Sequence, residues 1–182
     1  MRGFIVIILC GLILGCGKGG AGKDNPLLQP ALENLKAATT PEVRLPALAE
    51  AARQSLVAGQ TAESQKYAQE AITLLTSARG NANTGDAAHV AHQVLGRVAL
   101  RDGRLDEAKR QLMESASTPG PRLMDYGPKL GLASELLQKG ERQAVLDYFK
   151  ACAKFWNRNR LDEWSREINE GKTPEFPTNM LD

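Results

Sequence analysis

Three aligned stretches decide the fold of this 182-residue chain: VAGQTAESQKYAQEA (57–71), RDGRLDEAKRQLMES (101–115) and QKGERQAVLDYFKAC (138–152). The third residue of each is a glycine that follows one amphipathic stretch and precedes another. A glycine at such a position fits a helix C-cap or a tight turn between helices, because these turns need positive φ. These glycines, Gly59, Gly103 and Gly140, are 44 and 37 residues apart. Internal similarity at that period predicts an all-α fold, a short solenoid of antiparallel helical hairpins.

The composition agrees with helices and limits the classes of function. Hydrophobic residues make up 42% of the chain and charged residues 24%, which is too apolar a mixture for a disordered protein. After residue 15 the chain has six Val and two Ile against 21 Leu, whereas strands are rich in β-branched residues. The 23 Lys and Arg are nearly balanced by 21 Asp and Glu, while domains that bind nucleic acid are usually strongly basic. We therefore expect one helical domain that binds no nucleic acid.

The middle stretch resembles the tetratricopeptide repeat (TPR) family. Leu95-Gly96 falls on the family's Leu-Gly pair, and Gly103 falls on its turn glycine. Ala108 matches the small residue of the second helix, and Leu112 stands where a Phe is usual. A small residue at a helix crossing lets two antiparallel helices approach closely. The resemblance implies a TPR-like array.

The match departs from the family at several positions. His92 stands at the family's Trp position, Ala99 stands at its Tyr position, and Pro119 is offset by one residue. The outer units match more weakly, at Ala51-Ala52 and Ser64 in the first unit and at Leu132-Ala133, Val145 and Phe149 in the third. The resemblance covers about residues 45–156, and an unrelated helical bundle is the alternative.

The helical domain is expected to span residues 27–171. Near its start, Leu28, Leu32 and Leu35 share one face of a short helix. Near its end, another amphipathic helix is expected to cover the last hairpin, as terminal elements of solenoids must. Its apolar residues are Leu161, Trp164 and Ile168, and Gly171 closes it. Residues 172–182 contain two prolines and are expected to form an extended tail.

Turn-forming residues predict boundaries inside the domain. Thr40-Pro41 should begin a helix that has Pro46 in its first turn. The stretches 77–86 and 117–128 are rich in turn residues, and both are expected to be surface loops.

The first sixteen residues, MRGFIVIILCGLILGC, predict an export signal. One basic residue, Arg2, precedes an apolar run that is shorter than the roughly 20 residues needed to span a bilayer. Residues 13–16, ILGC, resemble the lipobox of bacterial lipoproteins: two aliphatic residues, a small residue and the cysteine that receives the lipid. A plain secretory signal and an uncleaved N-terminal anchor are the alternatives.

This resemblance implies a signal peptide over residues 1–15 and attachment of fatty-acyl chains, such as palmitate, at Cys16. Acyl chains hold a protein at a membrane because each buried methylene contributes about 0.8 kcal/mol. Residues 16–26 are expected to form a flexible tether. An Asp after the acylated cysteine favours the inner membrane in such lipoproteins, whereas Gly17 stands here. The resemblance therefore favours the outer membrane if the cell has two membranes.

No catalytic signature such as GxSxG, HExxH or CxxC occurs in the sequence, so we expect a binding protein, not an enzyme, with no cofactor. His89 and His92 are three residues apart on one predicted helix and could face the same metal ion. A zinc site needs at least a third ligand, and only Asp86 is nearby. We therefore predict no metal site. Cys152 lies in an apolar stripe and is expected in the core.

One binding surface is implied by the TPR resemblance. In TPR arrays the first helix of each pair lines a concave groove, and the corresponding positions here are Arg53, Gln93, Arg97, Arg101, Ser134 and Gln138. Gln93, Arg97 and Arg101 are four residues apart and share one helix face. Converging arginines would favour an acidic peptide or a terminal carboxylate, because guanidinium groups pair with carboxylates in bidentate fashion.

Together these features predict a lipid-anchored adaptor or scaffold of the bacterial cell envelope. Its TPR-like groove would bind an unidentified envelope protein or peptide. The alternative is a small-ligand-binding or enzyme-accessory lipoprotein. In that case the helices would enclose a pocket lined by His89, His92, Tyr126 or Trp156.

Overall fold

The computed structural model describes residues 24–77, 83–117 and 119–181. The predicted signal peptide, the predicted lipobox and most of the predicted tether lie outside these residues. The described residues form ten helices and no strand, which confirms the all-α class. The helices are α1 (Leu28–Ala37), α2 (Pro41–Val57), α3 (Thr61–Leu74), α4 (Thr84–Arg101), α5 (Leu105–Ser115), α6 (Pro121–Tyr126), α7 (Gly131–Gln138), α8 (Arg142–Cys152), α9 (Arg158–Asn169) and α10 (Thr178–Leu181).

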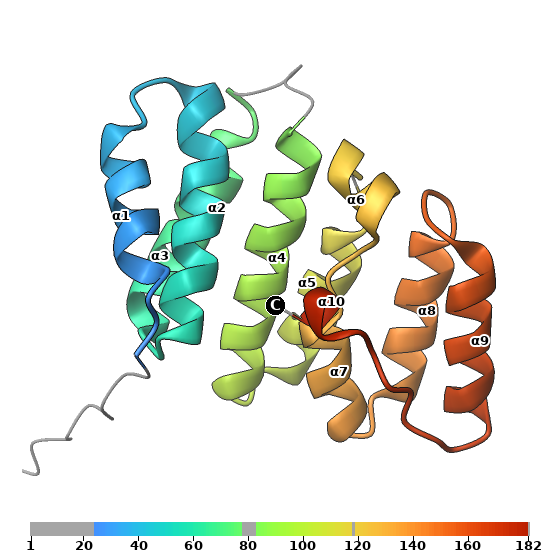
Figure 1. The fold of residues 1–182 in the computed structure, drawn as a ribbon. Helices are drawn as coiled ribbons and strands as arrows, with labels where there is room; N and C mark the ends of the chain where they lie inside the picture. The colour runs from blue at the N-terminus through green and yellow to red at the C-terminus, as the bar shows by residue number, and fades with distance from the viewer. Residues whose placement is uncertain (1–23, 78–82, 118, 182) are drawn as a thin grey trace, which may run out of the picture.

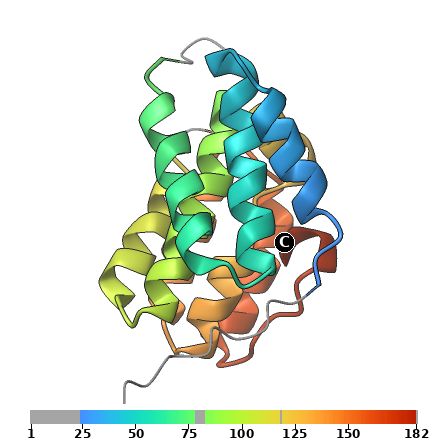
Figure 2. The ribbon, with the colours of Figure 1, turned by 90° about the vertical axis from the view of Figure 1, so that its left-hand side faces the viewer.

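The long helices lie side by side in chain order. Figure 1 shows the row from α1 on one side to α9 on the other, with α3 and α5 behind α2 and α4. Figure 2 views the row from its N-terminal end, where α1, α2 and α3 pack together. None of the helices in the described ranges is long and apolar enough to cross a membrane.

The three predicted turn glycines have the same backbone geometry. Gly59, Gly103 and Gly140 have φ of 79°, 75° and 84°. After each glycine, the next amide donates to a carbonyl five residues earlier: Gln60 to Ser55 at 2.8 Å, Arg104 to Ala99 at 2.8 Å, and Glu141 to Leu136 at 3.0 Å. This bond closes a Schellman-type helix end. The prediction of three equivalent turns with positive φ is therefore confirmed.

The aligned second helices also bury the same positions. The fifth residue after each turn glycine is Ser64, Ala108 or Val145, and each side chain has 0% exposure. On the preceding helix of the middle unit, Gly96 lies so close to Leu132 that a Cβ would overlap that side chain. Small residues therefore bring α4 close to its neighbours, as the middle stretch predicted.

The hydrophobic core has two parts. One joins α1 to α4 and includes Leu45, Leu48 and Leu56. The other joins α4, α5 and α7 to α9, and it contains a group of rings around Phe149 and Trp164. The predicted apolar stripe of α9 is buried in this second part, which also contains the free thiol of Cys152.

Three local predictions were wrong. Helix α2 begins at Pro41 and continues through Pro46, which lies beyond the first turn. The helix tolerates the lost amide there because the proline ring faces solvent. Part of 117–128 is not a loop but α6, which starts at Pro121 and buries Leu123. The tail is not wholly extended, because α10 follows residues 172–177 and packs against α7.

Candidate functional site

A cleft of about 390 Å³ lies between α2, α4, α6 and the C-terminal segment. Its charged lining residues are Glu50, Arg53, Asp86, Arg122 and Lys129, so three cationic groups face two carboxylates. His89, Val90, Leu123, Tyr126 and Met180 supply ring and apolar surface. The cleft therefore combines a small excess of positive charge with apolar walls.

Helix α6 is held against α4 by one carboxylate. The amide of Leu123 donates to Oδ1 of Asp86 at 3.1 Å, and the amide of Arg122 donates to Oδ2 at 3.3 Å. Gly120 lies so close to Asp86 that a Cβ would overlap its carboxylate. Asp86 thus satisfies amides at the start of α6 that the helix itself cannot pair.

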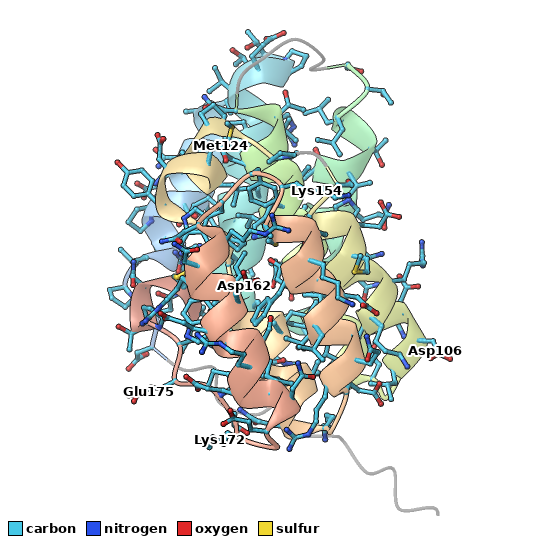
Figure 3. The ribbon with its side chains drawn as sticks, turned by 90° about the vertical axis from the view of Figure 1, so that its right-hand side faces the viewer. Asp106, Met124, Lys154, Asp162, Lys172 and Glu175 are labelled. Atoms are coloured by element: carbon cyan, nitrogen blue, oxygen red, sulfur yellow. The ribbon has the colours of Figure 1, made fainter. Side chains whose placement is uncertain are left out.

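Helix α6 carries two large exposed side chains, of which Tyr126 lines the cleft. Met124 is 55% exposed and Tyr126 is 72% exposed. Figure 3 shows Met124 at the end of the molecule opposite to Lys172. Exposed apolar residues of this size are common at surfaces that bind other proteins.

The connection between α6 and α7 is fixed by side chains from inside the domain. The amide of Lys129 donates to Nε2 of His89 at 2.9 Å, and the phenol of Tyr148 donates to the Lys129 carbonyl at 3.0 Å. Because His89 accepts at Nε2, its proton is on Nδ1, which donates to the Ser115 carbonyl at 2.7 Å. Both ring nitrogens of His89 are therefore engaged in hydrogen bonds with the protein.

His89 is neutral in this environment. Burial lowers its pKa to about 4, and the nearby Lys129 charge acts in the same direction, although the bond to the Ser115 carbonyl opposes them. His92 instead places Nδ1 2.7 Å from the Gln111 side-chain oxygen. The two histidines thus have separate structural partners. In the described ranges, no group of three His, Cys, Asp or Glu side chains could hold a metal ion.

Gln93 belongs to the same buried hydrogen-bond network. Its side chain donates to Ser115 Oγ at 3.0 Å and accepts from the Leu132 amide at 3.3 Å. Gln93 is 5% exposed, so its amide serves the packing of α7 on α4. It is not a free polar group on an open groove.

Two of the predicted arginines meet on one face, and each is paired with a glutamate. Arg53 makes a bidentate contact with Glu50, at 3.1 and 2.7 Å. Burial raises the pKa of Glu50, but hydrogen bonds from Arg53 and Gln54 outweigh it and the net pKa is lowered. Arg97 pairs with Glu135 on α7 at 2.8 Å.

Arg53 and Arg97 border a narrow space of about 20 Å³, together with Gln93, Gly131 and Leu181. The other three predicted groove residues do not line this space or the larger cleft. Arg101 and Gln138 are exposed near the ends of α4 and α7, and Ser134 is half-buried on α7. The expected convergence of three arginines is therefore wrong, because Arg101 lies one turn beyond the site.

Arg122 and Lys129 line the cleft, but they were not predicted from the sequence as site residues. Both lie in or just after the insertion that was predicted to be a surface loop. Pro121 could have indicated a helix there, because proline is favoured at the first helical position. The contacts between α6 and α4 could not be predicted, because the two helices are far apart in the sequence.

The predicted ligand pocket is formed only in part. His89 and Tyr126 line the cleft, whereas His92 and Trp156 do not. Trp156 packs against Gly127 and the Trp164 ring. Cys152 does not line the cleft either. Burial raises the pKa of its thiol to about 12, although a hydrogen bond with Tyr148 opposes the rise. Such a thiol is protonated at neutral pH and unsuited to nucleophilic attack.

In the described residues, these features define an all-helical protein with a mixed-charge cleft beside α6. Comparison of the chain with protein-family models, curated proteins and solved structures gives no match.

Proposed function

We propose that this protein is a lipid-anchored binding module of the bacterial cell envelope. The mature chain is attached to the membrane through a lipid on Cys16. In a cell with two membranes, the outer membrane is favoured. Its TPR-like hairpins carry the cleft of α2, α4 and α6, which binds a segment of another envelope protein. The protein acts as a scaffold or adaptor, through binding and not through catalysis.

The composition of the cleft is the observation that carries this proposal. Its two carboxylates are already engaged, Glu50 with Arg53 and Gln54, and Asp86 with two backbone amides. The cationic groups are in excess, and Arg122 is exposed at the rim. A ligand with a carboxylate complements this charge. Tyr, Met and Arg are also the residue types enriched at protein interfaces.

The anchor is supported by the sequence of residues 13–16 and by the distance that the tether allows. Residues 17–23 are mostly glycine and lysine, a composition that behaves as a flexible linker. The first described contacts of the domain come directly after this linker, where the Asn25 side chain donates to Gln54.

Photo-crosslinking in intact cells tests the proposal. A photoreactive amino acid at Tyr126, on the rim of the cleft, is expected to form an adduct with one envelope protein. The same probe at Asp106, whose side chain is 99% exposed on α5, is the control. Arg122→Glu should reduce the adduct at position 126 at least tenfold without changing helicity. Equal adducts at both positions, or no effect of Arg122→Glu, would contradict the proposal.

A small anionic ligand is the second candidate, favoured by the volume of the cleft. About 390 Å³ lies within the range of roughly 300–1,000 Å³ found for small-molecule sites. A thermal-shift screen on protein lacking residues 1–16 tests this alternative. A rise of several degrees in Tm with one class of carboxylate ligand, abolished by Arg122→Glu, would favour it over an adaptor.

A further inference from the structure

The C-terminal segment crosses the face on which the peptide groove was expected. Figure 1 shows it leaving the end of α9, passing in front of α8 and ending at α10, which packs against α7. Lys172 and Glu175, near its start, are exposed at one end of the molecule in Figure 3. The segment brings its last described residues to the face that carries Arg53 and Arg97.

Two side chains anchor the segment in the core. Phe176 is 6% exposed and makes edge contacts with the rings of Phe149 and Trp164, at centroid distances of 6.1 and 5.1 Å. Met180, four residues later, is 5% exposed and lies over Gly127. Aromatic contacts of this geometry contribute beyond the area they bury.

The backbone of the segment is recognised as well. The Leu130 amide donates to the Met180 carbonyl at 2.6 Å, and Nζ of Lys129 donates to the Asn179 carbonyl at 2.8 Å. At the first position of α7, Gly131 lies so close to the Leu181 carbonyl that a Cβ would overlap it. The surface therefore fits a peptide backbone, with pockets for two large apolar side chains.

Little open space is left under the segment. Leu181 covers Gln93 and Arg97 and leaves about 20 Å³ between them and Arg53. Leu181, the last described residue of the segment, thus lies beside Gln93 and Arg97, two of the residues that the TPR resemblance assigns to a peptide groove.

We propose that residues 173–181 are an internal ligand of a peptide-binding groove, and that a partner segment of similar pattern displaces them. Such a segment has large apolar side chains at positions i and i+4 and crosses α7 with its carbonyls toward Leu130 and Lys129. This inference rests on the proposed function and names a second part of the same binding face. The internal segment acts at a high effective concentration because it is linked to the groove. A partner can bind only while the internal segment is out of the groove. The apparent affinity for the partner is therefore reduced by the fraction of time for which the internal segment occupies the groove.

A synthetic peptide of residues 172–181 with a fluorescent label is the probe, and the full chain carries the variants. Phe176→Ser with Met180→Ser removes both anchors of the internal segment and leaves the groove intact. The labelled peptide is expected to bind this double variant at least tenfold more tightly than it binds the wild type. Adding Gly131→Ala should abolish binding, whereas Lys139→Ala, at an exposed residue just after the same helix, should not.

A second experiment tests the inference if the double variant does not fold. A protease site inserted between Lys172 and Thr173, both exposed, allows cleavage after folding. The cut segment is expected to dissociate and to be replaced by the labelled peptide while the helical signal is retained. A cut segment that cannot be displaced, or equal peptide binding by wild type and double variant, would overturn the inference.

The outcomes separate this inference from the proposed function. Loss of the crosslink at position 126 with intact peptide displacement would reject the adaptor proposal alone. An intact crosslink with no displacement would reject the internal ligand alone. A dimer that forms by exchange of residues 173–181 and resists the labelled peptide would also overturn the inference, because the segment would then join two copies.

Discussion

His89 shows how a buried side chain can hold in place other residues that line a cleft. Its ring connects the Ser115 carbonyl to the Lys129 amide, and so links the end of α5 to the chain that leads into α7. Lys129 in turn contributes its amine to the cleft and to the C-terminal segment. In the sequence, His89 has the appearance of a metal ligand. In the structure it fixes the loop that carries the Lys129 amine.

The pKa of His89 predicts a loss of stability in mild acid. Burial lowers this pKa from its ordinary 6.5 to about 4, so the unfolded chain takes up a proton at a pH where the folded chain does not. The contribution of the neutral ring to the free energy of unfolding is fully present above pH 6.5. It is lost as the pH falls toward 4, and the loss is about 3 kcal/mol in all. Urea denaturation at pH 7, 6 and 5 measures the loss. His89→Gln should be less stable at pH 7 and should lack this part of the slope; an unchanged slope would contradict the assignment.

Gly127 and Gly59 both have positive φ, at 88° and 79°, but their surroundings differ. An added Cβ would meet nothing at Gly59 and would lie 2.5 Å from the Trp156 ring at Gly127. Gly59→Ala should cost about 1 kcal/mol from backbone strain. Gly127→Ala should cost about 1–3 kcal/mol more, because the added Cβ overpacks against Trp156 and because φ 88° with ψ 167° is essentially restricted to glycine. Thermal denaturation compares them, and equal costs would contradict the described contact with Trp156.

At the level of elements, the repeated hairpin was readable from the sequence because its turn is local. A glycine with positive φ and a small residue five positions later are constraints within one stretch of chain, as at Gly103 and Ala108. The position of α6 and the path of residues 172–181 depend on contacts with α4 and α7 that are distant in sequence. Arg53 and Arg97 were predicted to share one face and both border the narrow space beside Gly131, whereas the place of Arg122 in the cleft follows only from the fold.

The small residues at the helix crossings give a test of the repeat register. The Ser64 hydroxyl is buried and has no hydrogen-bond partner in the described part of the chain. Ser64→Ala should therefore raise stability by about 1–2 kcal/mol, because an unsatisfied hydroxyl is removed. Ala108→Phe at the equivalent position should lower it by about 1–3 kcal/mol through overpacking. Chemical denaturation measures both, with the exposed Met113→Phe on α5 as the control.

A Ser64→Ala variant that is less stable, or an Ala108→Phe variant with an unchanged Tm, would show that these positions do not lie at the crossings. The first unit would then differ from the second more than their common turn geometry suggests.

At the scale of the whole molecule, the two core parts meet at α4, which also supplies residues to both the cleft and the narrow space. If the proposed function is right, binding at this helix is coupled to the packing of both halves of the row. Helix α6 and the C-terminal segment lie outside the three aligned stretches, and both supply residues to the cleft.

Lipid attachment makes a prediction for the full-length protein. Cys16→Ser removes the thiol that would carry the lipid, and the protein should move from the membrane fraction to the soluble fraction. Fractionation followed by immunoblotting measures this, and Cys152→Ser, a change in the core, is the control for a general effect of losing a cysteine. Membrane attachment that persists in Cys16→Ser would reject acylation at this residue.

Hydrogen exchange of the protein in its membrane tests whether the cleft binds another envelope protein. Exchange is compared between native envelope membranes and the purified protein in detergent. We expect extra protection in the envelope at α6 and at residues 127–131, which contribute to the lining of the cleft, and none on α3 or α5. Identical exchange in the two preparations, or protection confined to α3 and α5, would contradict the claim that this face binds another envelope protein.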